Sequence, residues 1–137
     1  MRKKLKNQLP ITGLLLIAFL VLTSHVPKDV TNDSNITNLL TIRSENGSEK
    51  TFDLLIMGKK ENQEIFFKHE KSIKTPYELK IGKGTYSIII HRTSKDGIVI
   101  GKIEMLVDGN SKASASSGEE ITLLTIDEEN NLGATGM

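Results

Sequence analysis

The sequence contains no cysteine and no tryptophan, and only four phenylalanines and two tyrosines occur among its 137 residues. Without cysteine the chain can form neither disulfides nor thiolate metal sites, and it has no cysteine nucleophile. Because aromatic residues are so few, isoleucine, leucine and valine must supply most of any hydrophobic core. We therefore expect a small aliphatic core that no disulfide reinforces.

Neither sign of charge dominates, since the chain has 18 basic and 17 acidic residues. Arg2, Lys3, Lys4 and Lys6 precede the first apolar run, and no acidic residue does. The rest of the chain therefore carries a small acidic excess, which leaves it without the basic footprint that binds phosphate backbones. We expect no nucleic-acid partner.

A long hydrophobic run follows these basic residues. Residues 11–22, ITGLLLIAFLVL, have the length of the apolar region of a signal peptide. A full membrane span needs about 20 apolar residues, and the run approaches that length only when it is counted over residues 9–26. Basic residues before an apolar segment stay cytoplasmic, so the remainder is directed outward. Residues 1–26 are thus predicted to be a hydrophobic helix, either a signal peptide or a single N-terminal membrane anchor.

The remainder divides into a polar linker, a β-rich domain and a tail. Residues 27–37 are polar and show no periodicity, and residues 128–137 are predicted to be a disordered tail. Between them, short runs of alternating apolar and polar residues are separated by turn residues, with residues 71–74 expected as a polar loop. The expected strands are residues 38–44, 51–57, 63–69, 76–81, 84–93, 98–107, 110–116 and 119–126.

Strands at roughly ten-residue spacing are typical of antiparallel sandwiches. We therefore predict an all-β domain over residues 38–127, an antiparallel seven- to eight-stranded β-sandwich of Ig-like or prealbumin-like type. Residues 86–90 and 98–107 are apolar on both faces over part of their length, which predicts central strands. Phe52, Leu54 and Ile56 alternate along residues 51–57 and are expected on one face, with Asp53 on the other.

The segment TPYELKIGKGTYSIIIHRTSKDG, residues 75–97, resembles the second half of a PEGA domain. That half consists of Thr-Pro, an alternating strand, a Gly-Thr-Tyr turn and a return strand. The matching residues are Thr75, Pro76, Leu79, Ile81, Gly84, Thr85 and Tyr86. Transthyretin-like modules share this hairpin, although the Pro-Glu-Gly-Ala tetrapeptide is absent here. The resemblance implies a prealbumin-like sandwich that mediates binding or spacing at the cell envelope.

Residues able to do chemistry are scattered along the chain. His69 and His91 lie on different expected strands, without the closely spaced ligands of a zinc site. The serines form no Gly-x-Ser-x-Gly nucleophile elbow. We expect no catalysis, no cofactor and no metal. An enzyme would instead need a cleft that groups Asp53, Glu64, His69 or His91.

These patterns indicate an exported protein, membrane-anchored or secreted, with a structural or protein-binding role at the cell envelope. Its expected partners are the membrane, through residues 9–26 if they are not cleaved, and another envelope protein. Ser111, Ala113 and Ala115 mark a strand of small side chains, which would leave its backbone accessible to a partner strand.

The alternative is a secreted module that binds a carbohydrate or another small ligand. Such a module needs exposed aromatic rings on a sheet face, and Phe66 and Tyr77 are the candidates for this ligand face. Because Phe66 and Phe67 are adjacent in an expected strand, one of them should belong to the core. The oligomeric state stays open at this point.

Overall fold

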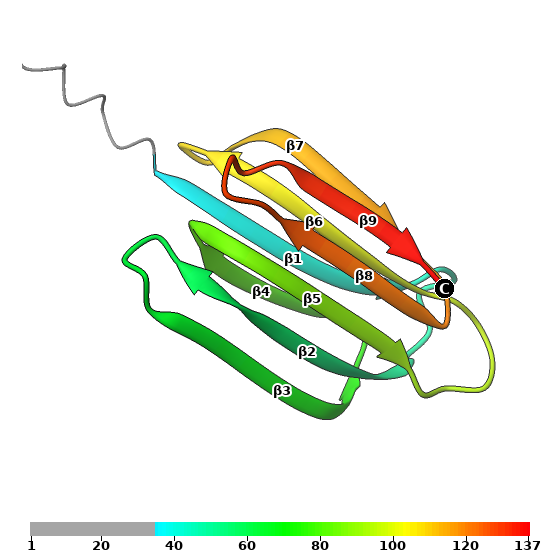
Figure 1. The fold of residues 1–137 in the computed structure, drawn as a ribbon. Helices are drawn as coiled ribbons and strands as arrows, with labels where there is room; N and C mark the ends of the chain where they lie inside the picture. Colours follow the sequence, from blue (N-terminus) through cyan, green and yellow to red (C-terminus); the bar gives the residue numbers. More distant parts are fainter. Residues whose placement is uncertain (1–34) are drawn as a thin grey trace, which may run out of the picture. The chain divides into compact units, whose positions relative to one another are not determined.

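The structure is a computed structural model that describes residues 35–137, so the predictions for residues 1–26 lie outside the described residues. The described chain is all-β (Figure 1). Within it, no helix is long and apolar enough to cross a bilayer. The strands are β1 (Ile36–Ser44), β2 (Thr51–Lys60), β3 (Ile65–Lys74), β4 (Tyr77–Gly82), β5 (Gly84–Arg92), β6 (Val99–Val107), β7 (Asn110–Ser117), β8 (Ile121–Ile126) and β9 (Leu132–Gly136).

These strands form two antiparallel sheets. One has four strands in the order β4-β1-β6-β7, and the other has five in the order β3-β2-β5-β8-β9. The predicted antiparallel, all-β, sandwich-like arrangement is confirmed, with nine strands among the described residues instead of seven or eight. As expected for strands that are apolar on both faces, β5 and β6 are interior strands of their sheets.

The core lies between the sheets and is built by alternation. Phe52, Leu54 and Ile56 in β2, which share one face as their spacing predicts, are 0% exposed. Tyr86 in β5 is only 2% exposed. The cause is the interior position of β5, which lies between β2 and β8. The other buried apolar residues are Leu40, Ile42, Ile81, Ile88, Ile90, Val99, Ile103, Leu124 and Ile126.

The prediction of a loop at residues 71–74 is wrong, because β3 continues to Lys74. Lys74 pairs with Thr51, and the ladder between β2 and β3 is interrupted only by a bulge between Phe52 and Leu54. At the bulge Ser72 has a φ of 54°, and its N–H donates to Asp53 Oδ1 at 2.8 Å. Polar side chains did not prevent strand formation here because β3 is an edge strand and most of them face solvent.

The prediction of a disordered tail at residues 128–137 is also wrong. Residues Leu132–Gly136 form β9, which pairs with β8 from Ile126↔Leu132 to Thr122↔Gly136. Asp127 organises the preceding turn, since its carboxylate accepts the N–H of Asn131 at 2.8 Å. Gly136 lies close to a neighbouring side chain, since a Cβ there would lie 2.2 Å from Glu119 Cγ.

Strand direction gives the sandwich two distinct ends. At the entry end the described chain begins at Asn35, beside the turns at residues 61–64, 108–109 and 127–131. At the far end lie the connections at residues 45–50 and 93–98 and the C-terminal residue Met137, which is hydrogen-bonded to Ile121. Figure 1 shows the C-terminus at the end opposite the start of β1.

Candidate functional site

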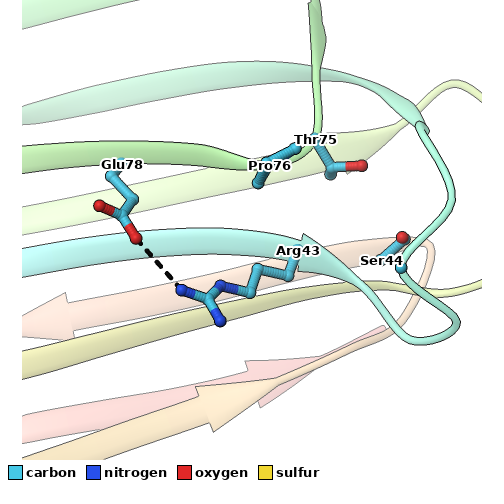
Figure 2. Close-up of a pocket in the computed structure, with 6 residues that line it drawn as sticks. Arg43, Ser44, Thr75, Pro76 and Glu78 are labelled. Carbon is cyan, nitrogen blue, oxygen red and sulfur yellow. Dashed lines mark hydrogen bonds and ion pairs between the residues drawn. The ribbon is translucent and has the colours of Figure 1, made fainter.

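The far end contains a shallow hollow of about 570 Å³, drawn in Figure 2. Across it Arg43 Nη2 and Glu78 Oε1 form an ion pair at 3.2 Å. The hydroxyls of Ser44 and Thr75 both donate to the carbonyl oxygen of Ser48. The polar groups of the hollow therefore hold its own walls together.

Lys50 extends this far-end network. Its side chain is 9% exposed, yet its Nζ lies 3.0 Å from Oδ2 of the exposed Asp96. Its backbone N–H donates to Thr75 Oγ1 at 2.9 Å, and its carbonyl accepts the Thr75 N–H at 2.9 Å. These contacts tie the β1–β2 loop to the β3–β4 and β5–β6 connections, which is a structural role.

The residues that an enzyme would need are only partly brought together. Asp53 is directly opposite His91 on adjacent strands, whereas His69 is opposite Leu55 and Glu64 lies in the turn at the entry end. Among residues 35–137 no group of three His, Asp or Glu side chains is arranged to hold a metal ion.

Phe66 and Tyr77, the predicted ligand face, are both half-buried against the core. The Phe66 ring meets Tyr86 edge-on at 5.9 Å between centroids, and the Tyr77 ring meets Phe52 edge-on at 6.0 Å. Phe66 is thus the core-side member of the Phe66–Phe67 pair, as adjacency in a strand requires.

Ser111, Ala113 and Ala115, the predicted partner edge, lie on β7, which is an edge of the four-stranded sheet. Ser111 is exposed and Ala113 half-buried, while Ala115 packs against the core. The ladder to β6 is irregular here, with a register shift between Met105 and Leu106. β9 lies close beside β7 (Figure 1). Whether β7 receives a partner strand stays a prediction.

A cluster of exposed apolar side chains stands elsewhere, on the outer face of the five-stranded sheet. Ile65 is 81% exposed, Phe67 is 64% exposed and Met57 is 42% exposed. Met57 and Phe67 are directly opposite on β2 and β3, and Ile65 is the next outward residue along β3. We call Ile65, Phe67 and Met57 the β3 patch. The sequence-based predictions did not include this patch, although strand alternation already places Ile65 and Phe67 on one face.

Two residues of the β3 patch lie on β3, an edge strand that is longer than the other edge strands. β4 has six residues and follows Pro76, β9 has five, and the ladder of β7 is irregular. Such features protect edges against pairing with other strands. β3 has ten residues, and its own irregularity, at Ser72, lies in its second half. The segment from Ile65 to Glu70 is therefore a regular, open edge.

Charged groups line the inner side of this edge. Lys68 Nζ lies 2.5 Å from Glu70 Oε1, and Tyr77 Oη donates to Glu70 Oε2 at 3.2 Å. The hydrogen bond to Glu70 raises the pKa of Lys68, and the hydrogen bond from Lys68 lowers the pKa of Glu70. Burial raises the pKa of Tyr77. At neutral pH the edge thus carries a cation and an anion.

We expect acid to destabilise the domain. Hydrogen bonds from Lys60, Lys68 and Lys50 lower the pKa of Glu64, Glu70 and Asp96 below their ordinary values of 4.5, 4.5 and 3.8. A carboxyl whose pKa is lower in the folded state stabilises the fold above the unfolded pKa, and this stabilisation is lost as the pH falls through the folded pKa. The thermal midpoint, followed by circular dichroism, should therefore fall as the pH drops below 4.5. A midpoint that stays level into that range would contradict the prediction.

The chain matches no protein-family model, no curated protein and no solved structure. The resemblance of residues 75–97 to a PEGA hairpin therefore stays a prediction.

Proposed function

We propose that this protein is an exported, non-catalytic domain of the cell envelope that binds another protein through the β3 patch. The observation that carries the proposal is the exposure of Ile65 and Phe67, 81% and 64%, beside an open edge strand. A cluster of large apolar side chains in solvent marks an interaction surface more often than a chance feature. The chain has only four phenylalanines, and one of them, Phe67, is exposed to solvent instead of contributing to the core.

Two further features support the proposal. The basic and apolar N-terminal residues favour export, and the sequence between them and β1 is polar, as in a linker. Such a linker would hold the sandwich away from the membrane or let it diffuse after cleavage. The PEGA-like residues of β4 and β5 agree with a role in binding or spacing. A carbohydrate or small-ligand site at Phe66 and Tyr77 is less favoured, because both rings are occupied in edge-on contacts with the core.

Export is tested by cell fractionation. We expect the full-length chain in a bacterial host to be found in the membrane or outside the cytoplasm, with added protease reaching it once the envelope is opened. Mass spectrometry of the mature N-terminus then separates an anchored protein from a cleaved one. The intact chain, dissolved in the cytoplasm and protected from protease, would contradict the proposal.

The binding surface is tested by photo-cross-linking in the same cells. A photo-reactive phenylalanine analogue replaces Phe67 in one variant and Met137, which is 69% exposed, in a control variant. We expect a discrete protein adduct from position 67 and none from position 137. Equal adducts from both positions, or none from position 67, would show that the β3 patch is ordinary surface.

A further inference from the structure

The open side of β3 presents backbone groups at defined positions. The N–H of Lys60 donates to the carbonyl of Glu64 at 2.9 Å, so the Glu64 carbonyl points toward β2. Successive residues of an antiparallel strand direct their backbone groups to opposite sides. Ile65, Phe67 and His69 therefore direct their N–H and C=O groups away from β2, into open space. The same residues that expose large side chains also expose an unpaired strand edge.

We propose that the partner at the β3 patch is a second copy of this chain, and that the two β3 strands pair antiparallel about a two-fold axis at Phe66. The inference rests on the proposed function, since it names the partner of the same surface. The two five-stranded sheets would then continue into one another across the axis. A symmetric contact of this kind requires a surface that is complementary to itself.

The sequence of β3 meets that requirement in this register. Ile65 faces Phe67 of the second copy, and Phe67 faces Ile65 of the second copy, so both exposed apolar side chains gain an apolar neighbour. On the other face Lys68 stands opposite Glu64 of the second copy, the residue directly before β3, at both symmetric positions. Opposite charges directly across a ladder stabilise it, whereas like charges destabilise it. Met57, beside Phe67 on β2, extends the apolar contact on each side.

Neighbouring registers lack this complementarity. An axis at Phe67 would place Glu64 opposite Glu70 of the second copy, and an axis at Lys68 would place two lysines opposite each other. An axis at His69 would carry the ladder into Ser72, whose φ of 54° interrupts a regular strand, whereas the axis at Phe66 needs only residues 64–68, which lie between Gln63 (φ 69°) and Ser72. Charge and backbone geometry thus favour the axis at Phe66 over these three registers. Tyr77 of β4 reaches Glu70 of β3, but β4 does not run along β3 as β9 runs along β7.

The register is tested by cysteine cross-linking, for which the chain offers a clean background because it has no cysteine of its own. Two differently tagged full-length copies are produced in one cell, one carrying Ile65→Cys and the other Phe67→Cys. We expect this mixed pair to form a cross-copy disulfide several-fold more efficiently than Ile65→Cys with itself or Phe67→Cys with itself. In the proposed register the mixed pair is directly opposite, while each identical pair is displaced by two residues, about 7 Å along the strand.

The charge pattern is tested by reversing one lysine in both cysteine copies. Lys68→Glu would place two glutamates opposite each other at both symmetric positions, and we expect it to reduce the mixed disulfide several-fold. The matched control is Lys74→Glu, which also removes an ion pair within the chain, Lys74 with Glu49 at 2.7 Å, but lies outside the proposed ladder. We expect Lys74→Glu to leave the disulfide unchanged, with equal amounts of folded protein in both variants.

The outcomes separate this inference from the proposed function. If position 67 cross-links to a different protein and no cysteine pair joins two copies, the second copy is excluded and the protein-binding role stands. If no cysteine pair joins two copies and position 67 gives no adduct at all, both are overturned. Efficient joining of identical cysteines, or equal loss with Lys68→Glu and Lys74→Glu, would reject the register and its charge pairing.

Discussion

Replacing Gly58 by alanine is expected to destabilise the domain strongly. A Cβ at this position in β2 would lie 2.2 Å from the backbone oxygen of Thr85 and 2.5 Å from Cδ1 of Tyr86. The first neighbour is backbone of the adjacent strand and the second is a buried ring, so neither can move without disturbing the centre of the sheet. Overpacking of this kind costs about 3 kcal/mol, which should lower the thermal midpoint by roughly 10 °C.

The matched control is Gly82→Ala. Gly82 ends β4, its φ is not left-handed, and a Cβ there would meet no atom within 4 Å. The same chemical change should therefore leave stability unchanged or raise it by about 0.5 kcal/mol, because alanine restricts the unfolded chain. Thermal unfolding of the two variants side by side measures the difference. Similar midpoints for both variants would mean that the close approach of β2 and β5 does not require a glycine at position 58.

Replacing Phe52 by alanine should have the second large effect. Phe52 is 0% exposed, and its ring meets Tyr77 edge-on at 6.0 Å. Removing a buried phenylalanine ring costs about 3–5 kcal/mol, because the core loses contacts and retains a cavity. A domain of this size has a free energy of unfolding of about 5–15 kcal/mol, so the variant would lose a large share of it. Urea unfolding, with the midpoint as readout, measures this loss.

Phe67→Ala is the comparison, because Phe67 lies in the adjacent strand but is 64% exposed. Its removal should change the free energy of unfolding by less than about 0.5 kcal/mol in dilute protein. At high protein concentration the wild type alone should gain stability from association, since a partner that binds only the folded state stabilises it. Equal losses for Phe52→Ala and Phe67→Ala would contradict the assignment of one ring to the core and the other to a surface.

Most of the β-structure could be predicted because alternation and turn residues are local signals. The alternation of Phe52, Leu54 and Ile56 indicates that they share one face, and the residues Gly82-Lys83-Gly84 indicate a chain reversal. Neither inference needs knowledge of a tertiary contact. The errors fell where tertiary context decides. Residues 71–74 are polar yet extend an edge strand, and β9 depends on the turn that Asp127 holds through Asn131. The close packing around a small residue such as Gly136 becomes visible only in the folded structure, where Glu119 lies beside it.

The candidate site was harder to predict because its signal is ambiguous within one strand. In Ile65-Phe66-Phe67-Lys68 both faces carry an aromatic ring, so alternation alone does not say which ring is buried. The edge-on contact of Phe66 with Tyr86, a residue 20 positions away in the chain, settles it. Which strands are edges is also a property of the whole sheet. For both reasons the sequence predicted a partner-binding edge at the small-residue strand around Ala113 and not at the longer open edge of β3.

The placement of the two chain ends has a mechanical consequence. The chain enters β1 at one end of the sandwich, and β1 is bonded along its length to both β4 and β6, while Met137 leaves from the opposite end in the other sheet. Tension between an attachment before Asn35 and a load on Met137 would run parallel to the strands. It would shear whole rows of hydrogen bonds at once instead of unzipping them singly, so the domain should resist stretching along this axis far better than across it.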